Sequence, residues 1–93
     1  MDYVIKRNGV KAPFEKEKIV NAIEKAMNDS SDSVNHKLSE QIANEIAAIS
    51  QPMDVEAIQN AVENRLMQSC HYETARCYMN YRYLHGIARN KYK

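Results

Sequence analysis

YVIKRNGVKAPF, the stretch at residues 3–14, decides the fold of this chain of 93 residues. Residues of high β propensity flank Asn8-Gly9, the dipeptide that best tolerates two consecutive positive φ angles, and this arrangement predicts a β-hairpin. An isolated two-stranded hairpin is only marginally stable in water. The hairpin must therefore lie against an apolar surface that the rest of the chain supplies.

The rest of the chain predicts four helices, because apolar residues recur at spacings of three and four. The first is expected over residues 15–28, before a polar connection, and the second should end at Pro52, which cannot continue a helix. Asp54 is a favourable N-cap for the third, and the fourth should begin near Tyr72. The expected apolar stripes are Ile19, Ala22, Ile23, Ala26 and Met27; Leu38, Ile42, Ile46 and Ile49; Val55, Ile58, Val62 and Leu66; and Ala75, Tyr78, Met79, Tyr81, Leu84 and Ala88.

These elements predict an α+β fold that is mainly α, a four-helix cluster capped at one end by a small two- to three-stranded β-sheet. Residues 51–53 are the candidate third strand. No apolar run approaches the roughly 20 residues of a membrane span, and the first residues lack the pattern of a signal peptide. We therefore expect one small cytoplasmic domain over residues 1–93, without membrane association.

The composition argues against several classes of function. Cys70 and Cys77 form no Cys-x-x-Cys pair and the three histidines lack metal-ligand spacing, so neither disulfides nor a side-chain metal site is expected. Cys70 and His71 are adjacent, but no third group orients them as a nucleophile and base. We expect no catalytic residue, because the remaining candidates are carboxylates at helix positions that should face solvent, namely Glu40, Glu45, Glu56 and Glu63.

A group of cations borders the predicted hairpin. Lys6 and Arg7 precede its turn, and Lys16 and Lys18 stand at the start of the first helix, where positive charge opposes the helix dipole. A bound phosphate would be attracted by these cations, by the dipole and by free backbone N–H groups. The apolar residues that an adenine ring would need beside them are Val4, Ile5, Ile19, Val55 and Ile58. From spacing alone, the alternative is a solvated basic edge next to ordinary core residues.

The C-terminal end suggests a different partner. Five cations occur there without an acid, and four tyrosines that could stack on bases are interleaved with them: Arg76, Arg82, Arg89, Lys91 and Lys93, with Tyr72, Tyr78, Tyr81 and Tyr83. Such a run is more often a solvated helix face, and the formal net charge of +1 lacks a nucleic-acid footprint. A nucleic-acid or protein interaction module is therefore an alternative, although we do not expect nucleic acid as the partner.

Nearly the whole chain resembles ATP-cone domains. VIKRNG (residues 4–9) and PFEKEKI (residues 13–19) are similar to the family's hairpin and first helix, and IQNAVENRLM (residues 58–67) with HYETARCYMNYR (residues 71–82) is similar to its third and fourth helices. The last two stretches look most like the cone of anaerobic, glycyl-radical ribonucleotide reductases. The absence of paired cysteines disfavours the zinc-ribbon repressor that also carries a cone. The resemblance implies an N-terminal regulatory domain of a longer chain whose catalytic residues lie elsewhere.

The resemblance also implies ligands and partners. An ATP-cone binds ATP as activator or dATP as inhibitor, with Mg²⁺ on the nucleotide, and acts on the catalytic domain of its host reductase through a nucleotide-dependent homo-oligomer of the full-length protein. Glu15 departs from the family's usual Asp or Asn, and Cys70 replaces the Gly that commonly ends the third helix. A cone that has lost its nucleotide is thus a further alternative. The implied nucleotide contacts are Val4, Lys6, Arg7, Glu15, Lys18, Ile19, Val55, Ile58, Gln59 and Arg82.

Overall fold

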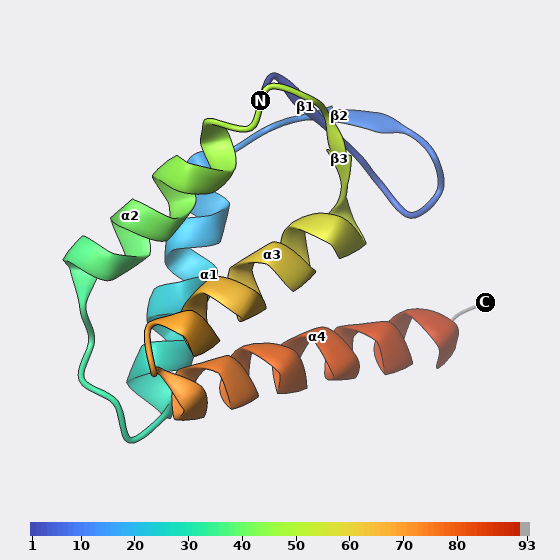
Figure 1. Cartoon of the computed structure of the whole chain (residues 1–93). Coiled ribbons are helices and arrows are strands. Elements are labelled where there is room, and N and C mark those ends of the chain that lie inside the picture. Colours follow the sequence, from blue (N-terminus) through green and yellow to red (C-terminus); the bar gives the residue numbers. More distant parts are fainter. Residues whose placement is uncertain (92–93) are drawn as a thin grey trace.

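The structure, a computed structural model, describes the backbone of residues 1–91 and the side chains of residues 1–83. The chain forms four helices and a three-stranded sheet, and Figure 1 shows the sheet at one end of the helix cluster. The predicted α+β class, mainly helical, is confirmed, and so is the third strand, although it comprises residues 53–54. In chain order the elements are β1 (Tyr3–Ile5), β2 (Lys11–Pro13), α1 (Lys16–Asp29), α2 (His36–Ala47), β3 (Met53–Asp54), α3 (Val55–Gln68) and α4 (Tyr72–Lys91).

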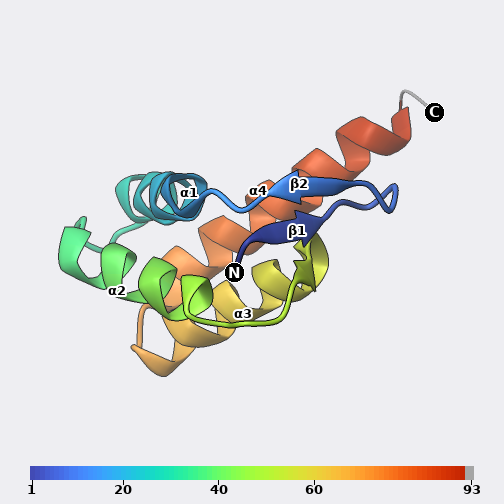
Figure 2. The ribbon, with the colours of Figure 1, turned by 90° about the horizontal axis from the view of Figure 1, so that it is seen from above.

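β1 is the central strand of the sheet, whose order is β2-β1-β3. It pairs antiparallel with β2, where Val4 lies opposite Ala12, and parallel with β3, where Val4 lies opposite Met53. Viewed from above in Figure 2, the hairpin lies in front of α4 and of the start of α3, and its turn extends past the start of α3. Since α3 begins at Val55, directly after β3, the parallel pair brings the start of α3 beside the hairpin.

The hairpin turn differs from the two-residue turn that Asn8-Gly9 suggests. The N–H of Lys6 donates to the carbonyl of Val10 (2.9 Å) and that of Gly9 to the carbonyl of Lys6 (2.8 Å), so the loop contains three residues. Among the turn residues only Gly9 has a positive φ, at 83°. A three-residue loop needs one such residue, whereas a type I′ turn needs two. The Asn8 side chain instead accepts a hydrogen bond from the N–H of Val10 (3.1 Å).

Side-chain caps begin two of the helices. Asn35 accepts from the N–H of Leu38 (3.0 Å) at α2, and Asp54 accepts from the N–H of Ala57 (2.8 Å) at α3, as predicted for Asp54. Glu15 occupies the N-cap of α1 with an extended backbone, but its side chain makes no capping hydrogen bond. The first backbone N–H groups of α1 are thereby left to other acceptors.

α2 ends at Ala47, so the prediction that it continues to Pro52 is wrong. The ammonium group of Met1 donates to the carbonyl of Ala47 (2.6 Å), one of the carbonyls that the end of a helix leaves without an intrahelical donor. Ile49 lies outside the helix yet packs against the core. The side chains of Leu84 and Ala88, predicted for the stripe of α4, lie outside the described ones. The core itself includes Ile23, Ala26, Met27, Ile42, Ile46, Val62 and Leu66.

The connection between α3 and α4 is a tight turn centred on Cys70. The N–H of Cys70 donates to the carbonyl of Met67 and the N–H of His71 to the carbonyl of Leu66, each at 2.9 Å. This is the Schellman pattern, whose residue after the cap adopts a left-handed backbone. Cys70 does so with φ of 62°. Within the part of the chain that the structure describes, no helix has both the length and the apolar character needed to cross a bilayer.

Candidate functional site

A cavity of about 320 Å³ lies between the hairpin, the first turn of α1 and the first turn of α3. The parallel pairing of β1 with β3 creates it, because this pairing sets α3 against the strand that leads into the turn. The cavity gathers seven of the ten predicted contacts from three separate parts of the sequence. They are Val4, Lys6, Glu15, Lys18, Ile19, Val55 and Ile58.

One wall of the cavity is apolar. Ile19 and Ile58 face it from α1 and α3 and are only 8% and 7% exposed, so both also belong to the core. Phe14 and Val4 pack against that core and line the cavity as well. Sequence reasoning missed Phe14 and two neighbours as lining residues, although PFEKEKI was part of the family resemblance. Those neighbours are Ala12 and Pro13.

The rim of the cavity is charged. Lys18 Nζ lies 2.7 Å from Glu15 Oε2, and the side chains are 79% and 54% exposed. An ion pair this exposed contributes little to stability, so an anionic ligand can displace Glu15 from Lys18 at small cost. Lys6 lines the cavity and has no ion-pair partner among side chains 1–83. No carboxylate among these side chains therefore competes with a ligand for its ammonium group. An apolar wall with two lysines at its edge suits a ligand that is flat at one end and anionic at the other.

Lys16 does not belong to this rim, which corrects the predicted group of four cations. Its ammonium group contacts Glu40 (3.2 Å) and the Asn44 side chain (3.0 Å), both on α2. Two residues along an α-helix correspond to a rotation of about 200°, so Lys16 and Lys18 face nearly opposite sides. Lys16 therefore joins α1 to α2, while Lys18 faces the cavity.

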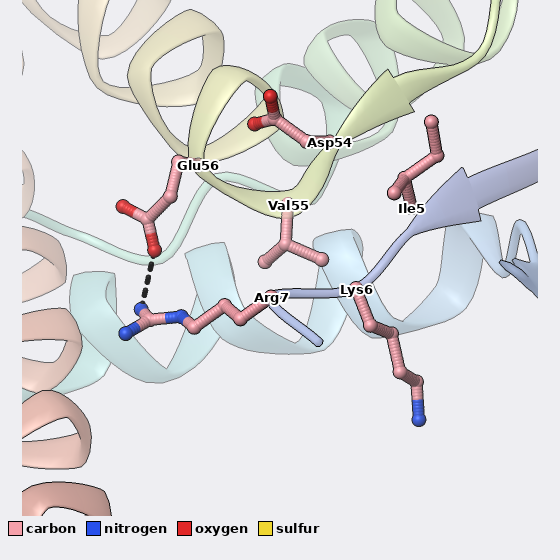
Figure 3. Close-up of a pocket in the computed structure, with 6 residues that line it drawn as sticks. All are labelled: Ile5, Lys6, Arg7, Asp54, Val55 and Glu56. Carbon is pink, nitrogen blue, oxygen red and sulfur yellow. Dashed lines mark ion pairs between the residues drawn. The ribbon is translucent and has the colours of Figure 1, made fainter. Parts of the chain in front are cut away.

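Arg7 lines a neighbouring cavity of about 440 Å³ that shares Lys6 and Val55 with the first. Figure 3 shows its side chain extending to Glu56 in the first turn of α3, with Nη2 at 2.5 Å from Glu56 Oε1. Lys6 extends in a different direction, away from Glu56. In this arrangement Arg7, predicted to hold phosphate, is engaged by a carboxylate and does not line the first cavity.

Arg82 of α4 is the most strongly held cation of the site. Its guanidinium donates to Glu56, to Glu63 Oε1 (3.0 Å) and to Asn60 Oδ1 (2.9 Å), and its side chain is 21% exposed. The hydrogen bond from Arg82 is the main reason that the pKa of Glu56 is lowered, and Glu56 in turn raises the pKa of Arg82. Both groups therefore stay charged at neutral pH.

Gln59 and Arg82 border a third, small cavity of about 100 Å³, so the structure does not bring them into the first cavity. The buried Tyr78 hydroxyl donates to the Gln59 side-chain oxygen. Burial raises the pKa of Tyr78, so this hydroxyl keeps its proton and remains a donor.

Glu56 and Glu63 were expected to face solvent, and for Glu63 this is wrong because it is only 9% exposed. The spacing of Glu56 and Glu63 along α3 indicates a shared helix face, which the prediction of solvent exposure did not consider. Positions 56, 60 and 63 are separated by four and three residues, so they share one face of α3. That face meets Arg82. The other two carboxylates of the expected set make surface pairs, Glu40 with Lys16 and Glu45 with Arg65.

The described part of α4 does not form a basic, aromatic platform. Tyr78 is buried and Arg82 is held internally, while Arg76 pairs with Glu73 on the same helix (3.2 Å). Tyr72 and Tyr83 are exposed. The side chains of Arg89 and Lys91, and all of Lys93, lie outside the described residues. Within the described residues, no three His, Cys, Asp or Glu side chains are grouped so that they could hold a metal ion.

Comparison with known proteins gives one family and several relatives. The family model described as ATP cone domain matches residues 2–87. Three proteins named anaerobic ribonucleoside-triphosphate reductase are similar to the chain: 41% identical over 92 residues in Haemophilus influenzae, 37% over 92 in Salmonella typhimurium and 36% over 95 in Escherichia coli. The matches cover 95% of this chain for the first and 96% for the other two. The chain spans 13% of the length of each relative.

Proposed function

Because this chain belongs to the ATP cone domain family, we propose that it is a regulatory domain that binds ATP or dATP and controls an anaerobic ribonucleoside-triphosphate reductase. The observation that supports the proposal is the first cavity. It combines an apolar wall, cationic side chains at the rim and the start of a helix, and it gathers seven residues to which the resemblance assigns nucleotide contacts.

In the proposed complex the adenine lies against the apolar wall, beside Ile19, Ile58 and Val4. Burying a flat ring there removes apolar surface from water, as in most nucleotide pockets. The phosphates extend toward Lys6 and Lys18, where the dipole and the uncapped N–H groups of α1 also attract an anion. The remaining proposed contacts, near the phosphates and the third cavity, are Glu15, Val55, Arg7, Gln59 and Arg82.

Magnesium belongs to this proposal as a companion of the triphosphate. The described side chains form no cluster that could hold a metal ion. Mg²⁺ keeps several of its waters and commonly binds through substrate phosphates rather than through an all-protein cage. The metal would supply charge neutralisation to the phosphates, while Lys6 and Lys18 orient them.

The regulatory part of the proposal concerns the difference between ATP and dATP. The two differ only by a ribose 2′-hydroxyl, and a ligand shifts a conformational equilibrium only through its differential affinity for the states. The hydroxyl, or the number of nucleotides bound, would therefore change a surface that contacts the catalytic domain or another subunit of the host. A cytoplasmic location is part of the proposal, and the two free thiols, Cys70 and Cys77, agree with a reducing compartment.

Calorimetric titration of the chain with ATP and with dATP, each with Mg²⁺, tests the proposal. We expect saturable binding of both. If the folded chain binds neither at millimolar nucleotide, nucleotide regulation by this domain is ruled out. Binding of an oligonucleotide that weakens steeply with salt, without nucleotide affinity, would favour the interaction module instead. For the regulatory step, activity and sedimentation of the full-length protein are compared in ATP and in dATP, and identical results would contradict the switch.

A further inference from the structure

Glu56 connects two parts of the molecule that do not otherwise share an ion pair among the described residues. One carboxylate oxygen contacts Arg7 of the hairpin turn, and the other contacts Arg82 of α4. The three residues come from distant stretches of the chain and from three different elements. A single carboxylate thus joins the segment beside the proposed phosphate site to the last helix.

The two arginines are held differently. Arg82 has two further acceptors, Glu63 and Asn60, whereas Glu56 is the only ion-pair partner of Arg7 among side chains 1–83. Arg7 is also more exposed, at 39% against 21% for Arg82. If an anion competes for these cations, Arg7 can leave Glu56 at less cost than Arg82 can, because Arg7 is the more exposed arginine and has fewer partners to give up.

A triphosphate bound in the first cavity would lie near Arg7. Arg7 adjoins Lys6 in the sequence, and Lys6 and Val55 line both the cavity of Arg7 and the proposed nucleotide cavity. A triphosphate carries several negative charges, so it attracts Arg7 and repels the Glu56 carboxylate at the same time. Arginine is suited to this exchange, since its guanidinium binds carboxylate and phosphate with the same planar geometry.

We propose that Glu56 is a positioning residue of the nucleotide site, which holds Arg7 away from the cavity until a triphosphate draws Arg7 onto the phosphates and leaves the carboxylate to Arg82. This inference rests on the proposed function, because it requires a triphosphate in the first cavity. It assigns Arg82 a role different from direct contact: Arg82 responds to the nucleotide through Glu56.

The test compares the 93-residue chain with Glu56→Gln and with a matched control, Glu45→Gln. Glu45 is a suitable control because its carboxylate also pairs with an arginine, Arg65 (2.9 Å), at the same 44% exposure as Glu56 but on α2. Calorimetry with ATP should show that Glu56→Gln tightens binding by about two- to fivefold, the range expected for releasing one exposed ion pair. Glu45→Gln should bind as the unchanged chain does. Thermal unfolding of the variants verifies that each is folded.

A second measurement follows the arginine side-chain N–H resonances by NMR. With saturating ATP, the Arg7 and Arg82 signals should both shift in the unchanged chain, whereas in Glu56→Gln only the Arg7 signal should shift. Unchanged or weaker ATP binding by Glu56→Gln overturns the proposal, and so does an equal Arg82 shift in both proteins. These failures leave ATP binding by the unchanged chain intact. Loss of that binding itself would instead refute the proposed function, and this inference with it.

Discussion

The Asp32 carboxylate, in the loop between α1 and α2, accepts hydrogen bonds from both the backbone N–H (3.1 Å) and the hydroxyl (2.7 Å) of Thr74 in α4. Thr74 is fully buried, and its hydroxyl also lies 3.3 Å from that of Ser30. The N–H of Asp32 donates to the same Ser30 hydroxyl (3.1 Å). A loop residue therefore caps the first turn of a helix that lies 42 positions further along the chain.

This cap predicts a pH-dependent stability. The hydrogen bonds from Thr74 are the main cause that lowers the pKa of Asp32 below its ordinary value, and a positive charge on His71, whose Nδ1 lies 3.7 Å from Asp32 Oδ2, acts in the same direction. A carboxylate with a lowered folded-state pKa stabilises the fold above its unfolded pKa and loses that effect as pH falls through the folded pKa. Asp32→Ala should therefore unfold at a lower temperature than the unchanged chain at pH 7, and the gap should narrow below about pH 4.

Thermal unfolding followed by circular dichroism between pH 2 and pH 7 measures this gap. Asp29→Ala is the control, because Asp29 is an exposed aspartate at the end of α1. The difference in unfolding temperature between Asp29→Ala and the unchanged chain should not narrow comparably at acid pH. A gap for Asp32→Ala that stays constant or widens down to pH 2 would contradict the assignment of the cap.

Two lysines in the first turn of α1 should differ in their effect on nucleotide binding. Lys18 lines the proposed cavity and Lys16 is held by Glu40 on α2. Lys18→Ala should weaken ATP binding by about tenfold, the loss expected for one hydrogen bond to a charged group, whereas Lys16→Ala should change it by less than about twofold because solvent and salt screen the more distant charge. Calorimetry on both variants shows which side of α1 meets the nucleotide. Equal losses would show that net charge alone matters, and no loss for Lys18→Ala would remove that residue from the phosphate site.

The left-handed backbone at Cys70 predicts a stabilising substitution. A residue with a Cβ atom is strained at φ of 62°, whereas Gly adopts this conformation freely. Cys70→Gly should raise the free energy of unfolding by about 0.5 to 1 kcal/mol, after allowance for the greater chain entropy that Gly brings to the unfolded state. Urea unfolding measures the change. Cys70→Ala keeps the strain and should give no such gain; an equal gain from both would point to the thiol rather than the backbone.

Local signals in the sequence predicted most of the fold. The hairpin, the Asp54 cap and the periodic stripes of Ile23, Ile42 and Val62 depend on neighbours within a few residues, and these predictions are confirmed. The errors concern features decided elsewhere in the chain. α2 ends at Ala47 rather than Pro52, where Met1 supplies a donor from the far end of the sequence. The turn type depends on the loop length that the register of β1 and β2 imposes, not on Asn8-Gly9 alone.

Most of the predicted site residues also lie together in the structure. Family resemblance supplied the ten residues, and seven line one cavity because the hairpin, α1 and α3 each contribute a contiguous segment to it. The other three have partners that a single sequence does not reveal: Arg7 pairs with Glu56, Gln59 with Tyr78, and Arg82 with Glu63. These contacts join residues 19 or more positions apart, and they depend on how the helices pack. Whether the ten contact nucleotide remains a prediction.

The central place of β1 has a consequence for how the domain is made. A ribosome releases residues 3–19 before residues 53–58, so the hairpin strands and the start of α1 emerge before the elements that stabilise them. The opposite wall, at Val55 and Ile58, arrives only after most of the chain has emerged. Closing so long a loop is slow and costs entropy that only the finished core repays. A nascent or truncated product would therefore display the lysines without a pocket, and the proposed nucleotide binding would begin only when translation of the domain is nearly complete.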